Sequence, residues 1–192
     1  MKFRIFTIIS ILTILVLSAC AQKGIKDAKN WEIADFTFTD QNNNSFGLAD
    51  LKGKIWVADF IFTNCEDVCM PMTANMVKLQ QMVKDKELKN VEFVSFSVDP
   101  AVDTPEVLTA YAKQYNADTT NWHFLTGFKQ VEIEKFGMDY FKTIIKKPQT
   151  GDQVIHQTYF YLIDQEGKIM KVYPGLADIP FDEILKDIKA LQ

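Results

Sequence analysis

The apolar positions of the chain follow two periods, one typical of strands and one typical of helices. Dense apolar runs at 55–62 and 91–98 are typical of strands buried on both faces of a sheet. Between them, apolar side chains recur at helical spacing, which predicts an amphipathic helix over 70–86. A buried strand, a helix and a second buried strand in this order predict a parallel βαβ unit.

Further elements are predicted on both sides of this unit. Alternating Phe and Thr over 36–39, followed by a polar turn at 40–44, predict a β-hairpin at the front. The later elements expected are a helix opened by Thr104-Pro105, a strand at 122–125, a helix over 128–136 stopped by Gly137, a strand over 154–163, a turn at Gly167 into a strand over 168–173, and a helix over 181–191. A βαβ unit followed by an antiparallel hairpin and a helix predicts an α/β, thioredoxin-like fold with an N-terminal β-hairpin and an inserted segment.

The N-terminus has the pattern of a secretory signal peptide. A positively charged start precedes an apolar run over 5–16, which is shorter than the roughly 20 residues of a membrane span. Small residues then lead to Cys20, a pattern that resembles the lipobox of bacterial lipoproteins, in which the Cys is lipidated. We expect a signal peptide over 1–19, a tether over 20–30 and one domain over 31–192, lipid-anchored on the extracytoplasmic face of the cell membrane. An ordinary signal peptide or an uncleaved anchor is the alternative.

Charge and cysteine content narrow the function. The net charge is −4, and no basic cluster is present, which argues against nucleic acid as a partner. If Cys20 carries lipid, Cys65 and Cys69 remain as a pair. Outside the cytoplasm such a pair forms a disulfide, a redox couple or a metal site.

The Cys pair lies between a central strand and its helix, where open α/β sheets place their sites. Cys69 is expected near a helix N-terminus, which favours a thiolate, and two thiolates select soft metals such as Cu(I). Glu66 and Asp67 disfavour the low thiol pKa of a fast redox couple and favour a bound cation. A structural disulfide would close a tiny loop and stabilise little. A redox couple remains open, because the spacing of Cys65 and Cys69 discriminates weakly.

His156 stands at the start of the late strand and offers a third ligand. If this strand shares a sheet with the Cys-bearing strand, the loop before it can reach the Cys pair, and an imidazole completes a copper site. A hydrogen-bonded bystander is the alternative, and we expect His123 to be one. Helical spacing places Met72 and Met76 in the core, whereas Met70 remains open as a soft ligand.

Four segments together resemble the Sco/SenC family of cytochrome oxidase assembly proteins. These are Phe62-Thr63-Asn64-Cys65-Glu66-Asp67-Val68-Cys69; Ser97-Val98-Asp99-Pro100 with Asp103-Thr104-Pro105; Trp122 with Phe124-Leu125-Thr126-Gly127; and His156 with Tyr161-Leu162-Ile163-Asp164 and Gly167. The resemblance covers about 30–192 and points to the Sco lipoproteins of Gram-positive bacilli. The family usually has Pro after each Cys, where Glu66 and Met70 stand here. We expect Asp99 and Asp103 to be solvated loop acids with helix-capping roles; a contribution to a partner surface is the alternative.

The resemblance implies that the domain binds one copper ion, Cu(I) or Cu(II), through Cys65, Cys69 and His156. It implies a metallochaperone for the binuclear copper centre of cytochrome c oxidase subunit II, which would be the partner of a monomeric, membrane-anchored chain. Family members are described both as copper donors and as thiol reductants. The alternative is therefore a thiol–disulfide oxidoreductase that keeps the subunit II cysteines reduced. A peroxiredoxin-type peroxidase fits less well, because Thr63 lies two positions before Cys65 rather than three.

Overall fold

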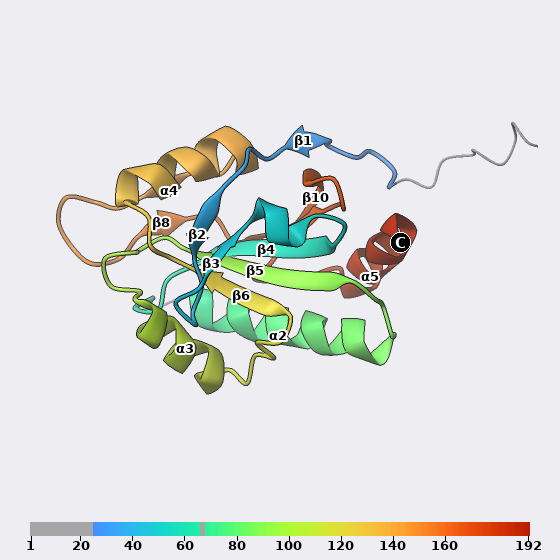
Figure 1. Cartoon of the computed structure of the whole chain (residues 1–192), viewed down its shortest axis with the longest axis horizontal. Helices are drawn as coiled ribbons and strands as arrows, with labels where there is room; N and C mark the ends of the chain where they lie inside the picture. Colours follow the sequence, from blue (N-terminus) through green and yellow to red (C-terminus); the bar gives the residue numbers. More distant parts are fainter. Residues whose placement is uncertain (1–24, 66–67) are drawn as a thin grey trace, which may run out of the picture.

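The computed structural model describes residues 25–65 and 68–192, so Cys20, the expected signal peptide, Glu66 and Asp67 lie outside the described residues. A six-stranded sheet forms the centre, with strand order β1-β10-β9-β4-β5-β6 (Figure 1). Its strands are β1 (Trp31–Glu32), β10 (Lys168–Pro174), β9 (Tyr159–Ile163), β4 (Ile55–Ile61), β5 (Val91–Ser97) and β6 (Trp122–Leu125). β4, β5 and β6 run parallel, whereas β9, β10 and β1 extend the sheet in antiparallel pairs.

Helices cover both faces of this sheet. One face carries α2 (Cys69–Asp85), α3 (Pro105–Gln114) and α5 (Phe181–Leu191), and the other carries α4 (Gln130–Phe136) and the hairpin of β2 (Thr37–Thr39) and β3 (Ser45–Gly47). Side chains of β4 alternate between the two layers: Ile55 and Val57 pack against the first, and Trp56 and Ala58 against the second. Burial on both faces explains why nearly every residue of this strand is apolar, with Asp59 as the exception.

The order of elements confirms the thioredoxin-like α/β fold. The parallel unit β4-α2-β5 is followed, after an inserted segment, by the antiparallel hairpin β9-β10 and by α5. The predicted N-terminal hairpin is present, with Phe38 opposite Phe46. The inserted segment spans 98–158 and contains α3, β6, α4 and a small ribbon of β7 (Ile145–Lys146) and β8 (Ile155–His156).

The α-helix α4 ends at Phe136, as predicted, but Gly137 does not stop the helical path of the chain. Gly137 has a helical φ of −59°, and the chain continues through a π-helical turn to Phe141 before Lys142 adopts a left-handed φ of 55°. A Cβ at position 137 would lie 2.6 Å from Cδ1 of Ile145 and 3.2 Å from Cγ2 of Thr143. The glycine therefore provides space for the β7 segment and does not serve as a left-handed cap.

The single strand predicted over 154–163 is two strands. β8 pairs with β7 in a separate ribbon, whereas β9 pairs with β4 and β10 in the main sheet. The ladder breaks between them, where the carbonyl of Thr158 accepts the backbone N–H of Gly175. His156 consequently lies beside the sheet, at the end of a two-residue strand that no sequence pattern separates from β9.

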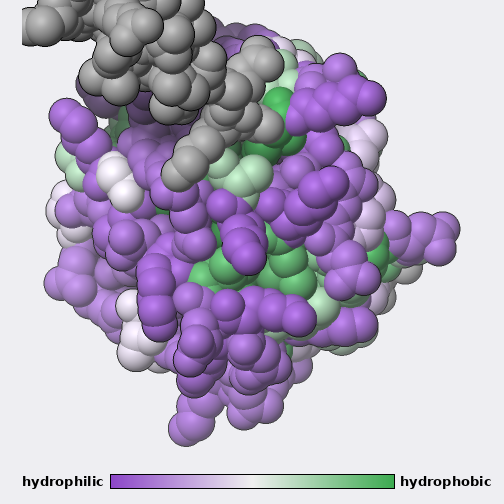
Figure 2. Space-filling view, turned by 90° about the vertical axis from the view of Figure 1, so that its right-hand side faces the viewer, coloured by the Kyte–Doolittle hydropathy of each residue, from purple (hydrophilic) through white to green (hydrophobic). Residues whose placement is uncertain are grey.

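The packed body begins before residue 31. Ile25 is buried in the core layer that contains α2 and α5, and the N–H of Lys29 donates to the carbonyl of Met170 at 2.9 Å. Ile25 and the backbone of Lys29, within the segment expected as tether, thus contact the domain, whereas Lys26, Asp27, Lys29 and Asn30 have exposed side chains. Among the helices of 25–65 and 68–192, none combines the length and the hydropathy that a membrane span requires. Figure 2 shows that the visible end of the molecule beside α5 is mainly hydrophilic.

Candidate metal centre

Both cysteines lie at the carboxyl end of β4, as the sequence predicts. Cys65 is four residues beyond the strand and partly exposed, whereas Cys69 is the first residue of α2 and is buried. The backbone N–H of Cys69 donates to Sγ of Cys65 at 3.3 Å. This turn at the helix start therefore brings the side chains of the two cysteines close together.

His156 reaches the same point from the β7-β8 ribbon. Its Nε2 lies 3.4 Å from Sγ of Cys69, and its Nδ1 lies 3.2 Å from the carbonyl oxygen of Gln157. The ring also meets Phe62 edge to face, with centroids 5.8 Å apart. A proton on Nδ1 that is donated to Gln157 leaves the lone pair of Nε2 directed toward the sulfur atoms, which is the tautomer that a metal requires.

The three donor atoms form a compact group that fits a single soft ion. Ligand atoms of Cys65, Cys69 and His156 all lie within 4.8 Å of one another. Metal bonds to sulfur and imidazole nitrogen of about 2.0–2.3 Å place ligand atoms up to about 4.6 Å apart. Only a slight contraction is needed, and two sulfurs with one imidazole suit copper better than hard cations.

The environment of Cys69 keeps its sulfur protonated when no cation is present. Its hydrogen bond with Cys65 and its burial raise the pKa of the Cys69 thiol well above the ordinary value, and the nearby Asp59 adds to this. A bound cation reverses that balance, because a coordinated thiol loses its proton. Cys69 is therefore not a permanently reactive thiolate, and a bound metal would displace its proton.

Hydrogen bonds tie the loop before His156 to the cysteine loop. The Asn64 side chain donates to Asp152 at 3.2 Å, and Gln153 donates to the backbone carbonyl of Asn64 at 3.0 Å. Asn64 directly precedes Cys65, so the two ligand-bearing segments are joined next to the ligands themselves. These contacts cross 88 and 89 positions of sequence, and nothing in the sequence pattern identifies them.

Asp99 and Asp103 are not the solvated capping acids that the sequence suggests. Both are buried, with 1% and 0% exposure, and Thr104 supplies the helix cap through a bond from the Val107 N–H. Asp99 accepts a 2.6 Å hydrogen bond from Lys147 in the segment that leads to β8. The two acids are buried because the turn that follows β5 is covered by the cysteine loop and by the segment before β8, which contribute Thr63 and Lys147.

Asp59 is a buried acid beneath the site that sequence analysis missed. It lies within β4, is fully buried, and accepts a 2.6 Å hydrogen bond from Ser95 on β5. Its Oδ2 has no hydrogen-bond partner among the described residues. Burial raises the pKa of Asp59 from 3.8 to about 7, against lowering contributions from Ser95 and His156. The available signal was one carboxyl in the middle of an otherwise apolar strand.

The other candidate residues lie outside the group. His123 stacks on Phe46 with centroids 3.9 Å apart and pairs with Glu92 at 3.2 Å, which confirms its expected role as a bystander. Met72 and Met76 are fully buried in the core, as predicted. Among these methionines Met70 alone is exposed, at 49%.

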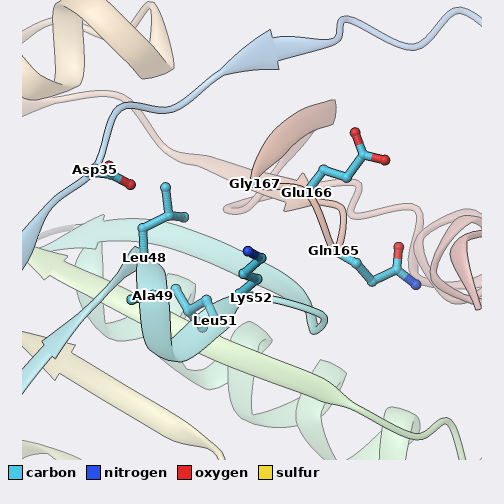
Figure 3. Close-up of a pocket in the computed structure, with 8 residues that line it drawn as sticks. All are labelled: Asp35, Leu48, Ala49, Leu51, Lys52, Gln165, Glu166 and Gly167. Atoms are coloured by element: carbon cyan, nitrogen blue, oxygen red, sulfur yellow. The ribbon is translucent and has the colours of Figure 1, made fainter.

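A pocket of about 450 Å³ lies at the other end of β4 (Figure 3). Apolar side chains of Leu48 and Leu51 line it, with Lys52 and Glu166 at its edge. The pocket lies near the N-terminal end of β4, whereas the cysteine loop follows its C-terminal end. The two ends of this seven-residue strand are about 20 Å apart. The pocket contains no sulfur or imidazole and is separate from the candidate metal centre.

Comparison with known proteins agrees with this geometry. The family model described as SCO1/SenC matches residues 26–192. The SCO1 protein homolog of Bacillus subtilis is 48% identical over 93% of this chain and 92% of its own length.

Solved structures give the same result. A SCO1/SenC family lipoprotein from Bacillus anthracis is 52% identical, with a TM-score of 0.85 over 88% of this chain and 99% of that chain. Bradyrhizobium japonicum ScoI, solved with copper bound, is 27% identical, with a TM-score of 0.66 over 84% of this chain and 98% of that chain. The chain therefore belongs to the SCO1/SenC family.

Proposed function

We propose that this protein binds one copper ion through Cys65, Cys69 and His156 and serves in building the binuclear copper centre of cytochrome c oxidase subunit II. The observation that carries the proposal is the convergence of two sulfurs and one imidazole nitrogen within 4.8 Å. The ligands come from the start of α2 and from β8, 87 positions apart for Cys69 and His156. A hydrogen bond between the Cys69 thiol and Nε2 of His156 explains that one contact without a metal, but it does not explain why Cys65 joins the same group.

The ligand types and a related structure support copper as the bound ion. Thiolate and imidazole ligands suit Cu(I), and a trigonal set of two sulfurs and one nitrogen also binds Cu(II) with intense thiolate-to-copper absorption. The described residues bring three such donors together, one fewer than the four protein ligands of a structural zinc site. Three ligands with water would also suit zinc, so the preference for copper rests on the relatives. The related ScoI of Bradyrhizobium japonicum was solved with copper bound.

The two histidines provide a matched test. His156→Ala removes a proposed ligand, so Cu(II) affinity should fall by more than the 10–100-fold typical for loss of a supporting residue. His123→Ala removes the histidine that pairs with Glu92 and should bind copper like the parent. Affinity is measured by competition with a chelator on reduced protein. Parent-like binding by His156→Ala would contradict the proposal.

We further propose that Cys20 carries a lipid that anchors the chain on the extracytoplasmic face of the membrane. Support comes from the small residues that precede Cys20 and from the relative in Bacillus anthracis, which is described as a lipoprotein. Mass spectrometry of the protein isolated from membranes tests this. A diacylglycerol-modified Cys20 at the N-terminus is expected, and an unmodified chain that still begins at Met1 would refute it.

A thiol–disulfide oxidoreductase is the second candidate, favoured by the unequal exposure of the two sulfurs. A partly exposed Cys65 beside a buried Cys69 is an arrangement in which one thiol can attack and the other can resolve. Reduction of disulfide-bonded subunit II by the dithiol protein distinguishes the roles. A reductase retains full activity in His156→Ala, whereas a copper carrier loses copper delivery in that variant.

A further inference from the structure

The turn after β5 contacts the cysteine loop through a single buried carboxylate. Oδ1 of Asp103 accepts two hydrogen bonds from Thr63, one from its backbone N–H at 3.2 Å and one from its hydroxyl at 2.6 Å. Oδ2 accepts the hydroxyl of Ser97. Three donors surround a side chain with no solvent exposure, and such a number is what allows a carboxylate to be buried.

These bonds hold the chain just before a candidate ligand. Thr63 lies two residues before Cys65 and two after the end of β4, beyond the last residue of β4 that pairs with β5. Asp103 accepts hydrogen bonds from both donors of Thr63, its backbone N–H and its hydroxyl, from 40 positions away. The backbone direction at Thr63 determines where the sulfur of Cys65 stands relative to Cys69.

The turn that carries Asp103 is itself firmly held. The backbone N–H of Asp103 donates to the carbonyl of Asp99, and the N–H of Asp99 donates to the hydroxyl of Ser97. Lys147 closes over the same turn through its ion pair with Asp99. Since Thr104 caps α3, the side chain of Asp103 is not required to start that helix. Its bonds serve the cysteine loop.

We propose that Asp103 is a positioning residue for the metal centre, which holds Cys65 at the spacing that Cys69 and His156 require. The inference rests on the proposed copper function and goes beyond it by assigning a role to a residue that touches none of the ligands. Loss of this contact leaves the three donors in place but frees Cys65 to move, so copper should bind more weakly and in an altered geometry.

Two substitutions of Asp103 and Thr63 test the contact from both sides. Asp103→Asn places an amide N–H₂ against donor groups and should weaken Cu(II) affinity by about 10–100-fold, the range typical of residues that support metal ligands. Thr63→Val removes only the hydroxyl bond and should cause a smaller loss in the same direction. Thr63→Ser keeps the hydroxyl and should restore parent affinity.

Spectra separate positioning from general stability. Asp103→Asn and Thr63→Val should both shift the thiolate-to-copper absorption band and the Cu(II) electron paramagnetic resonance signal. The control is Asp187→Asn on α5, which removes a buried carboxylate that pairs with Lys171 of β10. Helix α5 lies at the end of the molecule away from β8 (Figure 1). That control should lower the free energy of unfolding and leave affinity and both spectra unchanged.

The outcomes decide between the claims. Parent-like affinity and spectra in Thr63→Val overturn the positioning role, as does an equal loss in Thr63→Ser. If Asp103→Asn does not fold, the two Thr63 variants decide the question alone. Loss of affinity in His156→Ala, with Thr63→Val unchanged, removes only this inference, whereas unchanged affinity in His156→Ala removes the copper function on which it rests.

Discussion

Replacement of the buried acid in β4, Asp59→Asn, should remove a pH dependence of folding stability. Burial raises the pKa of Asp59 from 3.8 to about 7, so the folded protein holds this proton after the unfolded chain has released it. Stability from this group is therefore complete below about pH 4 and is lost as the pH rises toward about 7. Asparagine has nearly the same shape, still accepts from Ser95 and does not titrate.

The size of the effect follows from the width of that window. Each pH unit in which only the folded state holds the proton contributes about 1.4 kcal/mol. Across about three units, the free energy of unfolding of Asp59→Asn relative to the parent should rise by up to about 4 kcal/mol and then become constant above pH 7.

Urea unfolding monitored by tryptophan fluorescence, at several pH values between 4 and 8, measures this difference. Trp56 and Trp122 are fully buried and report global unfolding. Thiols are kept reduced and metal is removed. Asp178→Asn, at an exposed position, serves as the control and should give a constant difference from the parent. Parallel pH curves for the parent and Asp59→Asn would refute the argument that burial dominates at this site.

Two further substitutions test the packing of the inserted segment. Gly137→Ala gains helix propensity but forces a Cβ against Ile145, so it should destabilise by about 1–3 kcal/mol in urea unfolding; a more stable variant would contradict the close approach. Thr104→Ala removes the cap of α3 and should lower the free energy of unfolding by about 0.5–1 kcal/mol, with Thr104→Ser near the parent; equal values for both would show that the 3.4 Å cap bond contributes nothing.

The parts of the fold that repeat a strong local pattern could be predicted from the sequence. β4 and β5 lie within one residue of the predicted runs, because burial on both faces makes most of their positions apolar. α3 begins where Thr104 and Pro105 predict. Short elements set by tertiary contacts could not be predicted. β7 and β8 have two residues each, and Gly137 serves a packing need that its identity alone does not reveal.

The candidate ligands could be predicted for a similar reason, but the groups that position them could not. Cys65 and Cys69 stand at a strand end, where chemistry is expected, and the resemblance supplied His156. The contacts of Asp103 with Thr63 and of Lys147 with Asp99 join segments 40 and 48 positions apart. Such pairs follow from the path of the chain through three dimensions, which no local pattern encodes.

The most direct test of the account is X-ray absorption at the copper edge on reduced protein loaded with one equivalent of copper. We expect scattering from two sulfurs at about 2.3 Å and one imidazole at about 2.0 Å. The imidazole contribution should disappear in His156→Ala and persist in His123→Ala. A copper ion surrounded only by oxygen and nitrogen, with no sulfur neighbour, would contradict the proposed centre.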